Sequence, residues 1–180
     1  EEVVKAAAAM SQKHIGALIV FERDASLDEF VQQGTAMDAA VTKELLYSVF
    51  VPSHENPLHD GALVIRDGRV WQAGAVLPLT GSLKLDRSLG TRHRAAIGIT
   101  EETDAVVVVV SEERGSISLC FNGNMARDLD TGSLRQALLG LFQAPKRTRT
   151  DGTGRRTHAP GERGSQPGRG SSASIPPPRR

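Results

Sequence analysis

Cysteine and aromatic residues are scarce in this chain, and it contains no long apolar run. Its one cysteine, Cys120, excludes an internal disulfide and a cysteine-based metal cluster. Because Cys120 lies in the apolar run ISLCF, we expect it to be buried in a strand. A single cysteine also indicates a protein from a reducing environment. Aromatic residues make up 4% of the chain, so stacking platforms for single-stranded nucleic acid are not expected. No run approaches the roughly 18 apolar residues that a membrane-spanning helix needs.

Several familiar catalytic and nucleotide-binding motifs are also missing. The sequence has no Gly-x4-Gly-Lys-Ser/Thr phosphate loop and no Gly-x-Gly-x-x-Gly dinucleotide fingerprint. It also lacks the Gly-x-Ser-x-Gly nucleophile elbow and the His-Glu-x-x-His pair of metalloproteases. If the chain binds nucleotide phosphates, it therefore does so by another design.

The formal net charge of +1 hides two segments of opposite character. Acidic residues outnumber basic ones in residues 1–144, whereas residues 145–180 are rich in Arg, Pro and Gly and poor in apolar residues. Such a segment cannot bury enough apolar surface to offset the entropy lost on ordering it. We therefore predict one folded domain over 1–144 and a basic, disordered tail over 145–180. The tail is either a solvated extension or an electrostatic tether to nucleic acid or anionic lipid, with no motif for a specific nucleic acid.

Helices are predicted where strong helix formers or amphipathic spacing follow a capping residue. Thr42 and Thr91 are the predicted caps of two of these helices. The predicted helices cover residues 1–13, 42–50, 91–100 and 134–142, with a further short helix within 24–34.

Strands are predicted from short apolar runs, and two of the turns between them carry strong hairpin signals, Asp67-Gly68 and Asn122-Gly123. Five consecutive valines within 105–111 are typical of a strand covered on both faces. Interleaved helices and strands predict an α/β domain with a mixed central β-sheet surrounded by helices. The predicted strands cover 14–22, 62–66, 69–76, 105–111 and 116–121.

His59-Asp60-Gly61-Ala62 directly precedes a predicted strand. Gly61 allows a ligand or another backbone to approach closely. Asp60 can hold a metal or accept a proton from a hydroxyl group. The same four residues also fit an ordinary Asp-Gly turn.

Gly90-Thr91-Arg92-His93-Arg94 opens a predicted helix. A helix N-terminus offers free N–H groups and a partial positive charge to an anion. Two arginines there run against the usual charge preference, which is easier to explain if a polyanion binds, since guanidinium groups match phosphate geometry. The alternative is a pair of surface arginines in salt bridges.

Ser111-Glu112-Glu113 ends the valine strand. Polar residues at strand ends of α/β sheets are favoured positions for groups that bind ligands. Glu112 could complete a metal site with Asp60 or His59. Alternatively, the two glutamates only mark where a buried strand reaches water.

In combination, these segments resemble the diadenylate cyclase family. LHDGALVI (58–65) and LGTRHRAAIGITEETDA (89–105) are similar to its two hallmark motifs, Asp-Gly-Ala and Arg-His-Arg. HIGALIVFER (14–23), VLPLT (76–80) and VVVSEERGSISL (108–119) follow the family in the same order. The resemblance covers roughly residues 1–142, is strongest to the membrane-anchored CdaA type, and implies the diadenylate cyclase fold.

The resemblance implies that two ATP molecules are joined into cyclic di-AMP. The 3′-hydroxyl of each ATP would attack the α-phosphate of the other, and two pyrophosphates would leave. Because one domain binds one ATP, catalysis would need a head-to-head homodimer. A divalent metal, Mg²⁺, Mn²⁺ or Co²⁺, would assist. The alternative from another functional class is a catalytically inactive, nucleotide-binding regulatory module of the same fold.

The resemblance also implies roles for individual residues, which form a catalytic, an ATP-binding and a metal-binding group. Lys84 and Arg87, just before the phosphate motif, would either approach ATP or be solvated. The catalytic residues would be Asp60, which assists deprotonation of the 3′-hydroxyl, Gly61, which lies close to ribose or phosphates, and Arg92, His93 and Arg94. ATP would be bound by Arg92, His93 and Arg94 together with Thr91, Ser111 and the backbone of Leu77, which lies beside adenine. The metal would be held by Asp60, Glu112 and His59.

The resemblance to the CdaA type has a consequence for location. In that type, transmembrane helices precede the cyclase domain. Because the chain begins with Glu1 and not with Met, we expect an N-terminal membrane anchor to be absent from it. The full-length protein would then lie at the cytoplasmic face of the cell membrane, and this fragment would be soluble.

Overall fold

The computed structural model describes residues 1–82 and 89–143. Lys84, Arg87 and the predicted tail, 145–180, lie outside the described residues. Within the described ranges the chain forms α1 (Glu2–Gln12), β1 (Ala17–Phe21), β2 (Thr35–Ala40), α2 (Lys43–Phe50), the 3₁₀ helix η1 (Pro57–Asp60), β3 (Ala62–Arg66), β4 (Arg69–Ala75), α3 (Thr91–Glu102), β5 (Val106–Val110), β6 (Ile117–Phe121), β7 (Asn124–Ala126) and α4 (Thr131–Gln143).

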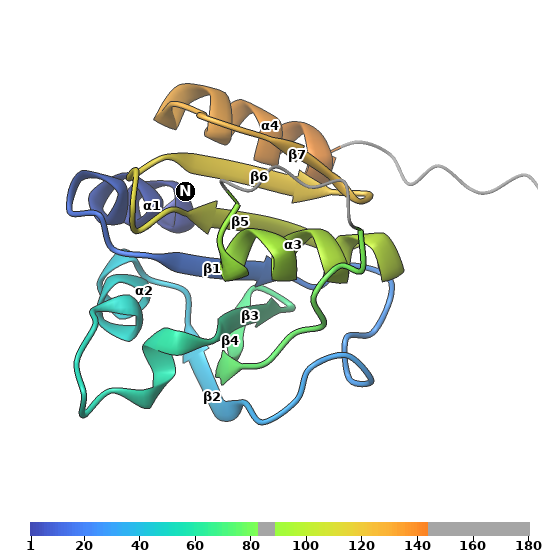
Figure 1. The fold of residues 1–180 in the computed structure, drawn as a ribbon, viewed down its shortest axis with the longest axis horizontal. Coiled ribbons are helices and arrows are strands. Elements are labelled where there is room, and N and C mark those ends of the chain that lie inside the picture. The colour runs from blue at the N-terminus through green and yellow to red at the C-terminus, as the bar shows by residue number, and fades with distance from the viewer. Residues whose placement is uncertain (83–88, 144–180) are drawn as a thin grey trace, which may run out of the picture. The chain divides into compact units, whose positions relative to one another are not determined.

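The strands form a seven-stranded sheet in the order β2-β4-β3-β1-β5-β6-β7 (Figure 1). β1 runs parallel to β3, and the other neighbouring pairs are antiparallel. The register pairs Ile19 with Leu63 and Ala17 with Val110. The start of β1, the start of β3 and the end of β5 therefore meet at one end of the sheet. The predicted α/β fold with a mixed central sheet is confirmed.

Helices cover both faces of the sheet, and α3 lies across the front of it in Figure 1. α1, α2 and α4 pack on one face around buried side chains such as Met10 and Phe50, and α3 packs on the other through Ile99. The five valines of β5 alternate between the two cores, and all are buried. This confirms that the strand is covered on both faces. A fully buried valine contributes roughly 1.5–3 kcal/mol of burial free energy, so β5 anchors both layers.

Cys120 is buried in β6, as predicted. Burial disfavours the thiolate and raises the pKa of the Cys120 thiol to about 12. A protonated, inaccessible thiol is not a nucleophile, so this residue acts as a small apolar side chain.

The two helix caps predicted from threonines have different outcomes. Thr42 caps α2, because its side chain accepts a hydrogen bond from the main-chain N–H of Leu45 at 3.2 Å. Thr91 is not a cap: it is the first residue of α3, and Gly90 occupies the cap position with no side-chain hydrogen bond. The prediction for Thr91 is wrong because Gly90 already has the extended backbone of a cap residue.

The predicted hairpin turns are confirmed, and the segment between β1 and α2 needs a correction. Asp67-Gly68 and Asn122-Gly123 both have positive φ, as tight two-residue hairpins require. Residues 24–34 form turns and not the predicted short helix, since the carbonyl of Leu27 closes a single turn and Asp104 accepts hydrogen bonds from the preceding main chain. Strand β2 follows, which the sequence analysis does not predict.

No helix in residues 1–82 and 89–143 combines the length and apolarity that crossing a bilayer would take.

Candidate active site

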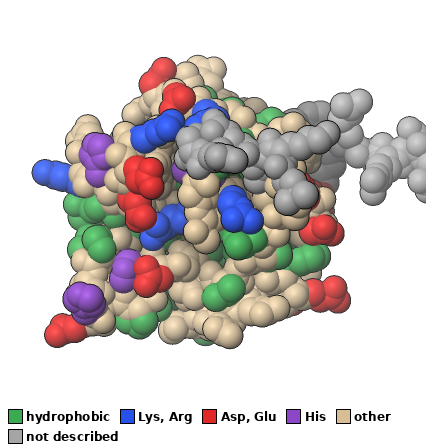
Figure 2. All heavy atoms as spheres, viewed as in Figure 1, with side chains coloured by type: hydrophobic (Ala, Val, Ile, Leu, Met, Phe, Trp, Pro, Cys, Tyr) green, Lys and Arg blue, Asp and Glu red, His purple; other side chains and the backbone are tan. Residues whose placement is uncertain are grey.

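Three segments meet at the end of the sheet where β1 and β3 begin and β5 ends. The first is η1, which carries His59 and Asp60 into β3. The second is the N-terminus of α3, and the third is the turn after β5 with Ser111 and Glu112. Figure 2 shows histidine, acidic and basic side chains gathered on the left-hand part of the face that α3 covers. Segments far apart in the sequence thus contribute to one polar region.

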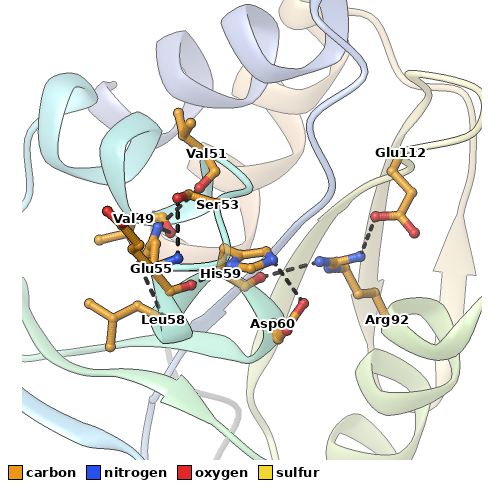
Figure 3. A network of polar contacts seen from close by, with 10 residues as sticks. Val49, Val51, Ser53, Glu55, Leu58, His59, Asp60, Arg92 and Glu112 are labelled. Atoms are coloured by element: carbon orange, nitrogen blue, oxygen red, sulfur yellow. Dashed lines mark hydrogen bonds and ion pairs between the residues drawn. The ribbon is translucent and has the colours of Figure 1, made fainter.

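Arg92 lies in the second segment and contacts the other two (Figure 3). Its Nη1 donates to Oε2 of Glu112 at 2.8 Å, and its Nη2 donates to the main-chain oxygen of His59 at 3.2 Å. The Arg92 side chain is 21% exposed and that of Glu112 is 62% exposed. Nε of Arg92 is buried and has no partner within the part of the chain that the structure describes. The guanidinium predicted to bind phosphate therefore contacts protein acceptors here.

Gly16, just before β1, lies directly against this ion pair. A Cβ atom added to Gly16 would come within 2.8 Å of Nη1 of Arg92 and 2.9 Å of Oε2 of Glu112. Both distances are shorter than van der Waals contact, so a larger residue would displace the pair. No role for Gly16 could be predicted from the sequence, because its place beside Glu112 follows from the pairing of β1 with β5, which no local motif encodes.

His59 and Asp60 form the second polar pair of the site. Nδ1 of His59 hydrogen-bonds to the main-chain oxygen of Asn56, and Nε2 lies 3.1 Å from Oδ1 of Asp60. Because the carbonyl and the carboxylate oxygens both only accept, the hydrogen bond to Asn56 needs a proton on Nδ1, and a hydrogen bond to Asp60 needs one on Nε2. Histidines that bind metals commonly donate their other ring N–H in this way. The Asp60 side chain is 79% exposed, so its carboxylate is accessible to a ligand.

Asn56 holds η1 in place and is a residue that the sequence analysis missed. Its Nδ2 donates to the main-chain oxygens of Val49 and Val51, both at 3.0 Å, which ties η1 to the end of α2. Its Oδ1 accepts from the N–H of Leu58 and caps η1, with Pro57 at the first helical position. An Asn-Pro pair is a known signal for a helix start, so this element could have been predicted.

Gly61 allows β3 to begin directly against β4. A Cβ atom on Gly61 would lie 2.3 Å from the carbonyl carbon of Gly74 and 2.6 Å from the N atom of Ala75. The close approach that the sequence suggested is therefore to a neighbouring backbone. The contact of Gly61 with ribose or phosphates stays a prediction. The same packing brings the exit of β4, which leads to Leu77, beside Asp60.

The segment after β4 lies on α3. Gly98 of α3 allows this approach, because an added Cβ would lie 2.4 Å from the main-chain oxygen of Pro78. The N–H of Thr80 donates to the main-chain oxygen of Arg94 at 3.1 Å. Leu77 is buried, and its main-chain N–H and C=O make no hydrogen bond within the described residues. These two groups suit the role beside adenine that was predicted for Leu77.

A cavity of about 110 Å³ separates the N-terminus of α3 from the end of β5. The first turn of α3 has no acidic residue and no side-chain cap, so its N–H groups suit an anion. Burial lowers the pKa of His93, with the positive charges of Arg127 and Arg114 acting in the same direction. His93 therefore favours its neutral form. The cavity is lined by Gly90, Thr91, Arg92, His93, Val110, Ser111, Glu112 and Glu113.

Arg94 does not line this cavity. Successive helical residues are rotated by about 100°, so the side chains of Arg92 and Arg94 leave α3 about 200° apart. Arg94 is exposed and lies beside the Leu77–Thr80 segment, through its contact with Thr80. The two arginines that the sequence analysis grouped together thus lie on different sides of α3, and phosphate binding by Arg94 stays a prediction.

The donors present fit a divalent cation that the substrate helps to bind. Among residues 1–82 and 89–143, no three His, Cys, Asp or Glu side chains form a ready-made metal site. Asp60 and Glu112 offer exposed carboxylates, and His59 offers an oriented imidazole. Mg²⁺ is commonly held by one or two carboxylates together with substrate phosphates, and Mn²⁺ and Co²⁺ also accept imidazole. Such a site has no need of a third protein carboxylate.

Comparison with known families gives this arrangement a context. The DAC family model, described as DisA bacterial checkpoint controller nucleotide-binding, matches residues 4–125. The chain belongs to this family. The matched segment contains every residue of the DAC domain to which the sequence analysis assigned a role.

The chain has curated relatives with the expected names. It is 39% identical over 155 residues to Cyclic di-AMP synthase CdaA of Bacillus subtilis (strain 168), covering 86% of this chain and 55% of that protein. It is 42% identical over 139 residues to Diadenylate cyclase of Listeria monocytogenes serotype 1/2a (strain 10403S), covering 77% of this chain and 50% of that protein. The chain thus spans about half the length of the curated relatives that it matches.

Solved structures show the same fold. A crystal structure of DacA from Staphylococcus aureus, a double mutant, is 46% identical with a TM-score of 0.72, covering 77% of this chain and 91% of that chain. A structure of a hypothetical membrane spanning protein from Bacillus cereus is 43% identical with a TM-score of 0.68, covering 72% of this chain and 62% of that chain. The predicted family resemblance and the diadenylate cyclase fold are confirmed.

Proposed function

We propose that the DAC domain is a diadenylate cyclase, which condenses two ATP molecules into cyclic di-AMP and releases two pyrophosphates. The observation that carries the proposal is the position of the exposed Asp60 carboxylate at the same sheet end as the uncapped N-terminus of α3. One group can accept a hydroxyl proton, and the other can hold phosphate. The names of the relatives support the same reaction.

In the proposed reaction, the 3′-oxygen of each ATP forms a bond to the α-phosphorus of the other, and the bond to the pyrophosphate breaks. The hydroxyl proton passes to the Asp60 carboxylate. Phosphoryl-type transfer depends mainly on in-line positioning and on neutralising charge, so the protein needs few reacting groups of its own. Asp60 suits the role of base because its exposed side chain makes no ion pair with an arginine or lysine among residues 1–82 and 89–143.

We place ATP across the same sheet end. Adenine lies beside the main chain of Leu77, and the ribose or phosphates lie near Gly61. The phosphate chain lies at the N-terminus of α3. There the N–H groups and Arg92 supply positive charge, and neutral His93 supplies a hydrogen bond. The remaining phosphate contacts come from Thr91, Arg94 and Ser111.

A divalent cation, Mg²⁺, Mn²⁺ or Co²⁺, would be held by Asp60, Glu112 and His59. When bound, it would stabilise charge on the α-phosphate and lower the pKa of the 3′-hydroxyl. The main-chain oxygen of Asn56 fixes the orientation of His59, and the loop from η1 to β3 fixes that of Asp60.

Two assembly features belong to the proposal. Because one domain binds one ATP, the cyclic product requires a head-to-head homodimer. We place the full-length protein at the cytoplasmic face of the cell membrane, held there by an N-terminal anchor. This is supported by the likeness to the CdaA protein and to a structure titled as a membrane spanning protein. No specific nucleic-acid partner is proposed.

Product stoichiometry tests the reaction. The full chain is incubated with ATP and Mn²⁺ or Mg²⁺, and cyclic di-AMP and pyrophosphate are quantified together. We expect two pyrophosphates for each cyclic product and a turnover per molecule that rises with protein concentration, as dimerisation requires. ATP consumption that yields ADP or linear products would contradict the proposal.

A further inference from the structure

Arg92 contacts two loops of the candidate site through different atoms of one guanidinium. Nη1 donates to Glu112, a carboxylate proposed to hold the metal, and Nη2 donates to the main-chain oxygen of His59, next to Asp60. Each contact uses one N–H of the guanidinium, and that N–H is therefore not available to a phosphate oxygen. The same side chain nevertheless lines the cavity at the N-terminus of α3, where we propose that phosphate binds.

We propose that Arg92 and the divalent cation exchange places at Glu112. When the cation binds the Glu112 carboxylate, the guanidinium leaves it and turns to the nucleotide phosphates. Arg92 thus occupies the Glu112 carboxylate until the cation binds, and it then becomes a phosphate ligand. This inference rests on the proposed function and adds that metal and nucleotide binding are coupled through one side chain.

The exposure of Glu112 favours exchange over a permanent ion pair. Glu112 is 62% exposed, so water screens its attraction to Arg92, and such pairs are individually weak. Nη1 makes a single contact with one carboxylate oxygen, and Nε has no partner within the described residues. A phosphate group can engage a guanidinium through two parallel hydrogen bonds, which would use more of its donors.

The surroundings restrict where Arg92 can move. The backbone of Gly16 lies against Nη1 and against the carboxylate, so the pair cannot shift towards β1. On another side lies the cavity of about 110 Å³ at the N-terminus of α3, which both Arg92 and Glu112 line. A guanidinium released from Glu112 would therefore turn towards the N–H groups proposed to hold phosphate.

Titration of the full chain with Mn²⁺ alone, followed by calorimetry, tests the exchange. Arg92→Gln removes the competitor for Glu112, so we expect it to bind Mn²⁺ more tightly than the unmodified chain, on the order of fivefold. Arg114→Gln removes the same charge two residues from Glu112 and should change Mn²⁺ affinity much less. Unchanged or weaker Mn²⁺ binding by Arg92→Gln, or an equal gain in Arg114→Gln, would overturn the inference.

The converse measurement uses ATP in the presence of a chelator and does not require an altered arginine. Glu112→Gln frees Arg92, so metal-free ATP should bind more tightly than to the unmodified chain, on the order of fivefold. Glu113→Gln, the neighbouring charge change, should give a smaller gain. Equal ATP affinities in the two variants would count against the exchange.

The exchange at Glu112 and the proposed function can fail separately. If the unmodified chain makes cyclic di-AMP while Arg92→Gln and Glu112→Gln show neither gain, the exchange is wrong and the proposed function stands. If the unmodified chain makes no cyclic di-AMP under any of the three cations, the proposed function itself is wrong.

Discussion

Gly16 and Gly61 shape the candidate active site through contacts that a side chain would prevent. Gly16 gives room to the Arg92–Glu112 ion pair, and Gly61 gives room to the backbone of β4. The partners differ in how easily they can shift. The ends of Arg92 and Glu112 are flexible, whereas the main chain of Gly74 and Ala75 is fixed within the sheet.

Gly61→Ala should therefore destabilise the fold. Its Cβ would lie 2.3 Å from a main-chain carbon, so β4 must shift, and overpacking of this kind costs about 1–3 kcal/mol in the free energy of unfolding. Urea denaturation would measure the loss. Gly140→Ala is the matched control, because nothing lies within 4 Å of its added Cβ and alanine favours a helix. Equal stability of the two variants would show that β3 and β4 are less tightly packed than described.

His93 should make the stability of the domain depend on pH. Burial lowers its pKa in the folded protein below the value of about 6.5 expected after unfolding. Between the two values the unfolded chain binds more protons, so the stabilisation is present above pH about 6.5 and is lost as the pH falls through the folded pKa. In urea denaturation between pH 7 and pH 5, His93→Gln should lose less stability than the unmodified chain. Parallel pH profiles for the two proteins would contradict this assignment.

Among the secondary-structure elements, α3 positions both ends of the proposed ATP site. Its N-terminus faces the cavity at Glu112, and Gly98, two turns later, receives the segment that carries Leu77. A single helix thus sets the distance between the proposed phosphate and adenine positions.

Gly98→Ala should weaken ATP binding more than it slows turnover. The added Cβ would lie 2.4 Å from the oxygen of Pro78 and 2.7 Å from the nitrogen of Thr80, so the segment must move away from α3 and take Leu77 with it. Displacements of this size commonly cost on the order of tenfold or more, and here we expect KM for ATP to rise about tenfold. Steady-state kinetics beside Gly140→Ala would measure this. An unchanged KM would remove Leu77 from the adenine site.

The elements that the sequence predicts well are those with strong local signals. The valine run of β5, the Asp67-Gly68 turn and the Thr42 cap each depend on residues close together in the chain. Strand β2 was missed because its sequence, TAMDAA, has few β-forming residues. It forms at the sheet edge by pairing with β4, and Arg69 holds its bulge at Asp38 through a 2.6 Å contact.

The candidate site was predictable as a set of motifs, and its internal contacts were not. The Asp60, Arg92 and Glu112 segments were each identified, and the structure brings them to one sheet end. The contact between Arg92 and Glu112 and its support by Gly16 depend on strand order and register, which link positions far apart in the chain. The opposite directions of Arg92 and Arg94 follow from helical rotation once the start of α3 is known.

For the whole molecule, the described residues contain every group that the proposed reaction uses. These groups lie between Gly16 and Glu112, and the predicted boundary at 144/145 falls well after them. The basic tail is thus expected to contribute no group to catalysis.

A chain that ends at Ala144 should therefore turn over ATP at the rate of the full chain. The two proteins would be compared at equal concentration and equal ionic strength, because the tail carries a net positive charge. Loss of turnover on truncation would contradict the division into a catalytic domain over 1–144 and a dispensable tail.

We propose that this DAC domain makes cyclic di-AMP with Asp60 as its base. The most direct test is a mass-resolved product assay of the full chain with ATP and Mn²⁺ or Mg²⁺, beside Asp60→Asn. Because the Asp60 side chain is exposed, the variant should fold normally, and loss of a general base should reduce the rate by about a hundredfold or more. We predict cyclic di-AMP from the unmodified chain and almost none from the variant. If the unmodified chain binds ATP and dimerises yet forms no cyclic di-AMP, the domain is a nucleotide-binding regulatory module and the claim is wrong.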